Sequence, residues 1–324
     1  MKEATNNNGC CVSALEAKYG KSAEELFSVA EYHPEAAERI GYSQYSYWKT
    51  VFRNFLRKKS VIVMGSLFIL LLIFTFIAPH IGHYRLETLH SNMKDMFQTP
   101  NSRYWFGTDN LGRDYWVQVW AATSNSIKLS GGVAIGECLL GILIGCIWGY
   151  VRALDRFFTE LYNLISNIPN IIYITLVGLF VGTSLYTLMF AMILVGWLQQ
   201  ARNIRNLVFL YRDREYNLAS RTLGTKVSSV LLKNVLPYLV SVIFLQFALS
   251  IPSTIAMETT LSYLGLGLGA EAMSLGVLLR NARTAVLQYP HLLFFPAVLV
   301  SIVTVTFYVL GNAFSDACDP KNHV

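Results

Sequence analysis

Charged residues are scarce in this sequence. Only 14% of its 324 residues are Asp, Glu, Lys or Arg, whereas 53% are hydrophobic. A soluble domain carries about a quarter charged residues, so this chain has too little polar surface to cover a globule in water. We expect lipid to surround most of it.

Several chemical motifs are also missing. The five cysteines form no CxxC pair and no Cys/His metal spacing, and neither HExxH nor GxSxG occurs. There is no GxxxxGKS or GxxxxGKT phosphate-binding loop, so we expect the chain to bind no ATP by that mechanism. The first forty residues lack the apolar stretch of a signal peptide. We predict no catalytic residue, no metal site and no cofactor bound by this chain.

The net charge of +6 does not indicate nucleic-acid binding. The basic residues lie beside apolar runs, as at the cytoplasmic flanks of membrane helices, and no base-reading motif is present. We expect membrane lipid, and no nucleic acid, as a partner.

Six apolar runs approach or exceed the ~20 residues that an α-helix needs to cross ~30 Å of hydrocarbon. They indicate an all-α membrane protein with six transmembrane helices. The runs cover residues 61–81, 127–150, 160–181, 185–208, 238–260 and 292–313.

The orientation follows from the basic residues. Five of them crowd before the first run, which places the N-terminus in the cytoplasm, and six crossings return the C-terminus there. The segment 209–237 and the predicted turn 150–159 then lie inside, and both contain arginines. The five residues are Lys49, Arg53, Arg57, Lys58 and Lys59.

Two segments precede the first run. Residues 1–44 form a cytoplasmic extension, either a short docking helix or a solvated tail, and we favour the tail. Residues 45–60 carry Trp48, Phe52 and Phe55 at helical spacing among cations, which predicts an amphipathic helix on the inner membrane surface. The remaining parts are a first transmembrane helix and extracytoplasmic loop (61–126), a core domain (127–313) and a cytoplasmic tail (314–324).

Helical spacing is interrupted once between the fourth and fifth runs. Glu215, Ala219 and Leu223 fall on one helical face, and Gly224 can adopt a positive φ that ends this first helix. The spacing then resumes up to Pro237, which suits the first turn of the fifth span. The pattern predicts a basic, cytoplasmic helical elbow that can pass motion between a soluble partner and the membrane.

This segment resembles the EAA loop of prokaryotic ABC import permeases, although Ser220 replaces the usual second Ala and Asn234 stands where His is common. In that family the loop is a coupling helix that docks in a groove of the ATP-binding subunit. The resemblance implies that residues 216–228 do so here. The residues assigned to coupling are Glu215, Tyr216, Ala219, Ser220, Leu223, Gly224, Thr225, Lys226 and Pro237.

Three further stretches resemble the second, C-type subunit of dipeptide, oligopeptide and nickel permeases. They are WFGTDNLGRDYW at 105–116, ETTLSYLGLGLG at 258–269 and GNAFSDACDP at 311–320. With the elbow, the resemblance covers residues 46–320. The outer-loop motif supplies Gly107, Thr108, Asp109, Gly112, Arg113 and Asp114.

The resemblance implies a type I ABC importer permease fold in a prokaryotic cytoplasmic membrane, with the chain forming half of a heterodimeric pore. The implied partners are a second homologous permease subunit, two ATP-binding subunits that carry ATP and magnesium, and an extracytoplasmic solute-binding protein. The chain itself would not be an enzyme. The implied substrate is a di- or oligopeptide, with nickel as the alternative.

Two single acids and one group of three charged residues have two interpretations each. Glu258 is either a structural hydrogen-bonding group, which we favour, or a substrate contact. Glu137 either pairs within the bundle, the favoured interpretation, or lines the pathway and meets a substrate amino group. The charges of Asp109, Arg113 and Asp114 either stabilise a local turn, which we favour, or dock the solute-binding protein.

Two other classes of membrane protein are disfavoured. An ion-coupled secondary transporter needs several intramembrane acids or paired repeats of broken helices, and the sequence shows only Glu137 and Glu258 and no inverted repeat. A membrane enzyme needs a reactive cluster at membrane depth, and the sequence contains none.

Overall fold

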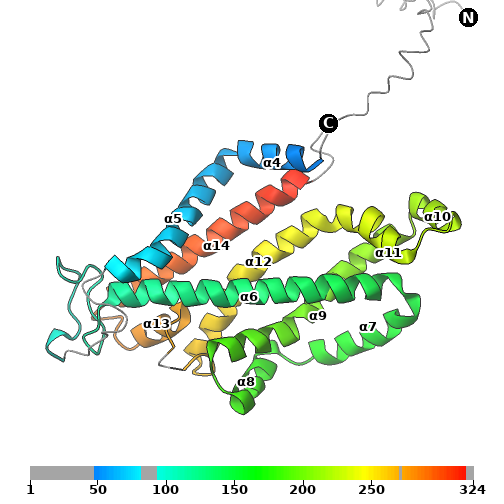
Figure 1. The fold of residues 1–324 in the computed structure, drawn as a ribbon. Coiled ribbons are helices and arrows are strands. Elements are labelled where there is room, and N and C mark those ends of the chain that lie inside the picture. The colour runs from blue at the N-terminus through cyan, green and yellow to red at the C-terminus, as the bar shows by residue number, and fades with distance from the viewer. Residues whose placement is uncertain (1–46, 82–92, 270–271, 319–324) are drawn as a thin grey trace, which may run out of the picture. The chain divides into compact units, whose positions relative to one another are not determined.

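A computed structural model describes residues 47–81, 93–269 and 272–318 of the chain. Within these ranges the chain is mostly α-helical and forms no β-strand, which confirms the all-α prediction for this part (Figure 1). The predicted 1–44 extension lies outside the described residues, as does the end of the predicted C-terminal tail.

The bounds of the helices follow in chain order. They are α4 (Tyr47–Arg57), α5 (Lys59–Ile81), η2 (Met93–Asp95), α6 (Tyr115–Tyr150), α7 (Arg152–Ser166), α8 (Asn170–Val181), α9 (Leu185–Arg212), α10 (Glu215–Thr222), α11 (Val227–Val230), the π-helix η3 (Leu231–Val235), α12 (Leu236–Tyr263), α13 (Leu275–Ala282) and α14 (His291–Cys318).

α4 is the amphipathic helix that the sequence predicts before the first span. Val51 on its inner face is buried and packs against Cys318 at the end of α14, whereas Trp48 is exposed. At the α4–α5 junction, the Nζ of Lys58 donates a hydrogen bond to the Oδ2 of Asp316 at 2.9 Å. The first and last described helices are therefore joined to each other.

Four helical segments are long and apolar enough to cross a membrane. They contain the predicted first, second, fifth and sixth spans. A bent helix pair raises the number of candidate spans among the described residues to five. The four segments are Lys59–His80, Tyr115–Tyr150, Val227–Tyr263 and His291–Cys318.

The third predicted span is wrong as a single helix. Residues 160–181 contain a break after Ser166, and α7 and α8 are bent by 81° at this break. Pro169 has no backbone N–H and disfavours helical dihedrals at Ile168, so the chain turns here. The predicted turn at 150–159 is also wrong, because only Val151 separates α6 from α7.

The fourth predicted span, 185–208, lies within α9, which continues to Arg212. Its first half is apolar, but Gln199, Gln200 and Arg202 follow at its centre. Because of this polar second half, α9 is not among the segments that length and composition alone mark as candidate spans.

Glycines bring α6 and α9 into the most extensive helix contact of the described chain. A Cβ atom on Gly145 would lie 2.6 Å from the carbonyl oxygen of Ala201 and 2.9 Å from the Cβ of Ile204. Only a residue without a side chain allows the two backbones to approach this closely, as is common where helices pack in lipid.

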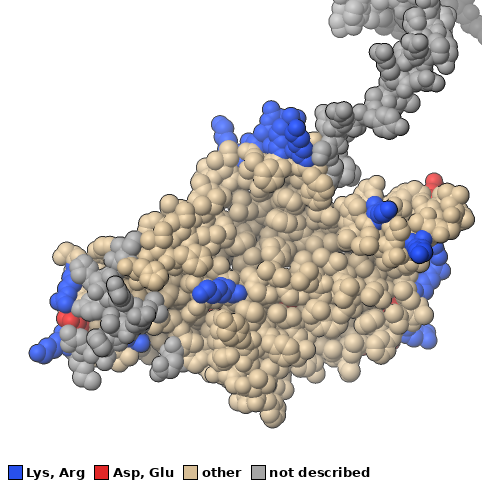
Figure 2. Space-filling model, viewed as in Figure 1, with Lys and Arg blue, Asp and Glu red and all other residues tan. Residues whose placement is uncertain are grey.

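The long helix α6 connects two ends of the bundle. The outer loop and α13 lie near its first residues, whereas α10 lies near its last (Figure 1). On the face shown in Figure 2, Lys and Arg side chains gather towards these ends and on α4, and the surface between them is almost wholly uncharged. This distribution suits an apolar belt between two polar surfaces.

Candidate functional site

The predicted elbow exists as two short helices around Gly224. α10 ends at Thr222 with Leu223 as its C-cap, Gly224 has a φ of 83°, and the N–H of Thr225 donates to the carbonyl of Ser220 at 3.1 Å. This hydrogen bond satisfies a carbonyl at the helix end, as glycine-terminated helices commonly do. Lys226 then precedes α11.

Most of the predicted coupling residues are exposed. Leu223 has 86% of its surface exposed and Tyr216 has 43%, although both are large apolar side chains. Desolvation, with a smaller contribution from Tyr238, raises the pKa of the Tyr216 hydroxyl above its ordinary value, so the group stays neutral at physiological pH. Of the nine residues, only Ser220 is partly covered. Glu215, Tyr216, Ala219, Leu223, Gly224, Thr225, Lys226 and Pro237 are exposed.

Two asparagines hold the elbow against the start of α12. Asn217 is fully buried, and its Nδ2 donates to the carbonyl of Tyr211 at 2.9 Å. The Nδ2 of Asn234 donates to the Oδ1 of Asn217 at 3.1 Å and to the Oγ of Ser220 at 3.4 Å. Sequence analysis missed Asn217, and it noted Asn234 only as a departure from the family pattern.

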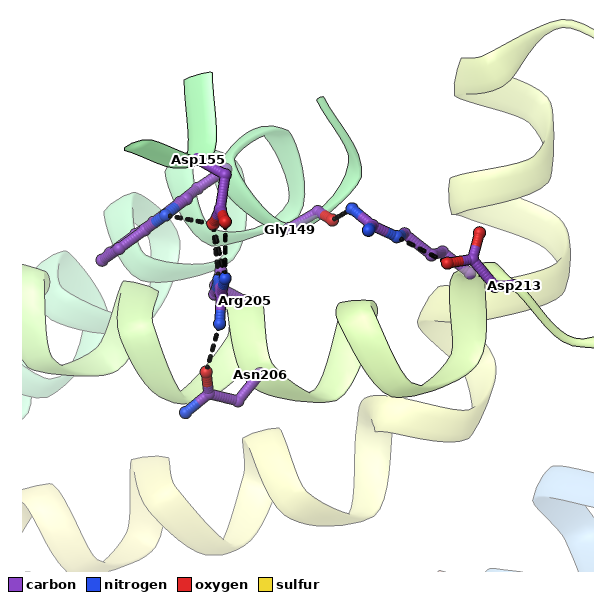
Figure 3. A network of polar contacts seen from close by, with 7 residues as sticks. Gly149, Asp155, Arg205, Asn206 and Asp213 are labelled. Atoms are coloured by element: carbon purple, nitrogen blue, oxygen red, sulfur yellow. Dashed lines mark hydrogen bonds and ion pairs between the residues drawn. The ribbon is translucent and has the colours of Figure 1, made fainter. Parts of the chain in front are cut away.

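A buried arginine at the end of α9, directly before the elbow, ties α9 to the end of α6. The Nη1 of Arg212 donates to the carbonyl of Gly149 at 2.7 Å, and its Nε lies 3.2 Å from the Oδ2 of Asp213 (Figure 3). Arg152 at the start of α7 lies 3.5 Å from the same Asp213 oxygen. These contacts join the end of α9 to the end of α6 and the start of α7, directly before the elbow.

A second ion pair lies beside it. The Nε and Nη2 of Arg205 donate to the two carboxylate oxygens of Asp155 at 2.8 and 2.7 Å (Figure 3). The indole of Trp148 donates to the same carboxylate at 3.1 Å. Both charged side chains are more than two-thirds buried, so water screens this pair less than a surface pair.

We expect Arg205→Ala to lower the free energy of unfolding by about 2 kcal/mol, because it leaves the Asp155 carboxylate without its bidentate partner. Thermal unfolding of the purified subunit in detergent measures the change. Asp155→Ala combined with Arg205→Ala should cost less than the sum of the two single changes. Additive costs would show that the two side chains do not stabilise each other.

The outer-loop motif forms a closed turn before α6. The Oδ1 of Asp109 accepts hydrogen bonds from the backbone N–H groups of Leu111 and Arg113, and the Arg113 guanidinium pairs with Oδ2 at 2.7 Å. Gly107 and Gly112 have positive φ angles of 78° and 72°. Thr108 and Asp114 are buried at the base of the turn, where Thr108 receives a hydrogen bond from the Gln98 N–H, and Asp114 caps α6 by accepting one from the Trp116 N–H.

We expect Arg113→Ala to lower the thermal unfolding temperature, because the carboxylate of Asp109 loses its ion partner. Docking of the solute-binding protein should stay within about threefold of the wild type, since this ion pair contributes mainly to the turn. Unfolding of the subunit and binding of the solute-binding protein measure the two effects separately. An unchanged unfolding temperature with lost docking would favour the docking role.

Glu258 lies near the C-terminal end of α12 and is fully buried. Its Oε1 accepts hydrogen bonds from the Oγ of Ser262 at 2.8 Å and from the Oγ of Ser274 at 2.6 Å. A Cβ atom on Gly276 would lie 2.6 Å from its Oε2, so the start of α13 closes over the carboxyl group. The contacts fasten α13 to α12.

Glu137 lies near the middle of α6, away from these partners. Its Oε2 accepts a hydrogen bond from the Oγ of Ser250 on α12 at 2.7 Å. The side chain is half-buried and borders a cavity between α6, α8, α9 and α12. The two predicted intramembrane acids therefore have separate surroundings. Within the part of the chain that the structure describes, no group of three or more His, Cys, Asp or Glu residues could hold a metal ion.

Comparisons with known proteins agree with this architecture. Residues 141–324, more than half of the chain, match the family of the binding-protein-dependent transport system inner membrane component. Residues 46–100 match the N-terminal TM domain of oligopeptide transport permease C.

Individual relatives are similar over nearly their whole length. The oligopeptide transport system permease protein AmiD of Streptococcus pneumoniae (strain ATCC BAA-255 / R6) is 36% identical over 93% of this chain and 98% of its own. The oligopeptide permease OppC and the dipeptide permease DppC of Bacillus subtilis (strain 168) are 32% and 30% identical, over 92% and 94% of this chain and 97% and 95% of their own.

These matches confirm the family that the four motifs predict, and with the candidate spans they make the chain a multi-pass membrane protein. The chain belongs to the family of binding-protein-dependent transport system inner membrane components.

Proposed function

We propose that the chain is a permease subunit of an ATP-driven peptide importer. The observation that carries the proposal is the exposed elbow around Gly224, which presents large apolar side chains next to a helix, α10, whose buried Asn217 ties it to the end of α9. Relatives named for oligopeptide and dipeptide transport favour peptides over nickel as the substrate.

The proposed topology has six crossings, with both termini in the cytoplasm. It counts the bent pair α7–α8 as one crossing and α9 as another, in addition to the four long apolar segments. The polar second half of α9 must then be shielded from lipid. α6 packs against it through Gly141, Gly145 and Gly149 and provides this shielding. The cations of α4 and of the elbow lie on the cytoplasmic side in this topology.

The chain would form half of the pathway, with a second homologous permease subunit as the other half. Two ATP-binding subunits would carry ATP and magnesium, so that this chain holds no cofactor and is not itself an enzyme. Residues 216–228 would dock in the ATP-binding subunit, and closure of the ATPase pair would move the elbow and turn the bundle from inward-facing to outward-facing. Glu258 would act at the outer gate by fastening α13 to α12.

Reconstitution into liposomes with the partner subunits and a solute-binding protein tests the proposal. We expect uptake of a radiolabelled oligopeptide that requires ATP hydrolysis and persists when ionophores collapse the ion gradients. Uptake that follows an ion gradient without ATP would instead support a secondary transporter. ATP-driven uptake of nickel but not of peptides would assign the alternative substrate.

A further inference from the structure

A carboxylate at membrane depth borders a partly open cavity of about 100 Å³. Glu137 lies near the middle of α6, and its hydrogen-bond partner Ser250 lies at the midpoint of α12, so both are far from the polar ends of their spans. Acidic residues are rare at such depth, and those that occur mark pathways for ions or substrates.

The cavity has one ionisable group and several uncharged polar groups in its lining. Among its lining residues, Glu137 is the only one that ionises, and Asn170, Ser253 and Thr254 add uncharged oxygen acceptors. Met192 and Met257 line part of the remaining wall. No Lys or Arg lines the cavity, and none of the ion pairs formed by the described residues involves Glu137.

One oxygen of the carboxylate remains available. Oε2 accepts the Ser250 hydrogen bond, whereas no described residue donates a hydrogen bond to Oε1. The carboxylate lies against Gly196 of α9, where a Cβ atom would overlap Oε1. The absence of a side chain at position 196 therefore leaves room for the acid in the wall of the cavity.

The size and the acceptors fit a primary ammonium group. The cavity holds about three water molecules at ~30 Å³ each, which is room for an ammonium group and the carbon that carries it. An ammonium group donates three hydrogen bonds, and the carboxylate, amide and hydroxyl oxygens supply the acceptors. A metal ion would need more carboxylates or His and Cys ligands than the cavity offers.

We infer that Glu137 forms a transient binding site for the free amino terminus of a peptide that passes through the membrane. The inference rests on the proposed peptide import. The flexible side chains of Met192 and Met257 beside the carboxylate accept different first residues.

Glu137→Gln tests the charge while it keeps the size of the side chain. The probes are trialanine and N-acetyl-trialanine. Calorimetry first gives the concentration at which each peptide saturates the solute-binding protein, and import is then measured at that concentration. We expect the Glu137→Gln variant to import about tenfold less trialanine per ATP hydrolysed than the wild type, because a charge-assisted contact is lost. Import of the acetylated peptide should not change.

Ser250→Ala is the matched control, because it removes the internal hydrogen bond and keeps the carboxylate. We expect its import of trialanine to stay within about threefold of the wild type. If the solute-binding protein does not bind the acetylated peptide, the test is the ratio of trialanine import by Glu137→Gln to trialanine import by Ser250→Ala.

Two results would overturn the inference. One is wild-type import of trialanine by Glu137→Gln, and the other is an equal loss in both variants, which would make the Glu137–Ser250 pair structural. The proposed function fails differently. In that case the wild-type complex imports neither peptide, although the solute-binding protein stimulates its ATPase.

Discussion

We expect Gly224→Asp to abolish co-purification of the ATP-binding subunits while the chain stays in the membrane. Gly224 has a φ of 83°, and a residue with a side chain costs about 1–2 kcal/mol in this left-handed region. Among the described residues, no atom lies within 4 Å of a Cβ atom built on Gly224, so the new carboxylate projects into the space that a docked partner would fill. A charge buried there without a partner costs several kcal/mol more. Pull-down from mild detergent measures the loss.

Gly182→Asp is the matched control for this experiment. Gly182 also has a positive φ, of 106°, and also has no atom within 4 Å of a built Cβ atom, but it lies in the turn between α8 and α9 at the opposite end of α9. We expect this variant to retain the ATP-binding subunits. Equal loss in both variants would show that backbone strain, rather than docking, explains the result. A wild-type chain that retains no ATPase would remove the basis of the importer proposal.

We expect Gly145→Leu to lower the free energy of unfolding by about 3 kcal/mol or more. A Cβ atom at this position already meets the backbone of α9 at 2.6 Å, and backbone atoms cannot rotate away as a flexible side chain can. α6 and α9 must then separate along their largest contact, which also displaces Arg205 and Asp155. Thermal unfolding in detergent, followed by tryptophan fluorescence, measures the effect.

Gly131→Leu provides the comparison within the same helix. No atom lies within 4 Å of a Cβ atom built on Gly131, so the substitution should change the unfolding temperature little. Leucine also favours the helix over glycine by up to about 1 kcal/mol, which would act in the opposite direction. A similar loss of stability at both positions would mean that helix packing does not depend on the Gly145 contact.

Much of the helical framework could be predicted because its signals are local. The apolar runs mark α5, α6, α12 and α14, and a glycine within basic helical sequence marks the break at Gly224. The bend between α7 and α8 was not predicted, although Pro169 lies at it. An apolar run shows that a segment is hydrophobic but not in which direction its helix axis points. The run therefore continues across a turn when the segments before and after the turn both lie in lipid.

The contacts inside the candidate site could not be predicted, because they join distant parts of the chain. Arg212 and Gly149 are 63 residues apart, and Ser250 and Glu137 are 113 apart. Sequence analysis considered that Glu137 pairs within the bundle or lines the pathway, and the structure shows both a serine partner and a bordering cavity. A single sequence does not indicate which faces of two helices pack against each other.

The ion pair between Lys58 and Asp316 joins two parts of the chain that are made at different times. The two residues are 258 positions apart, so at ~5–20 residues per second a ribosome needs roughly 13–50 seconds to make the second after the first. During that interval α4 and α5 have no α14 to pack against, and their buried faces must be covered by lipid or by a chaperone. Because α14 is made last, we expect quality-control proteases to recognise a prematurely terminated chain by its uncovered first helices.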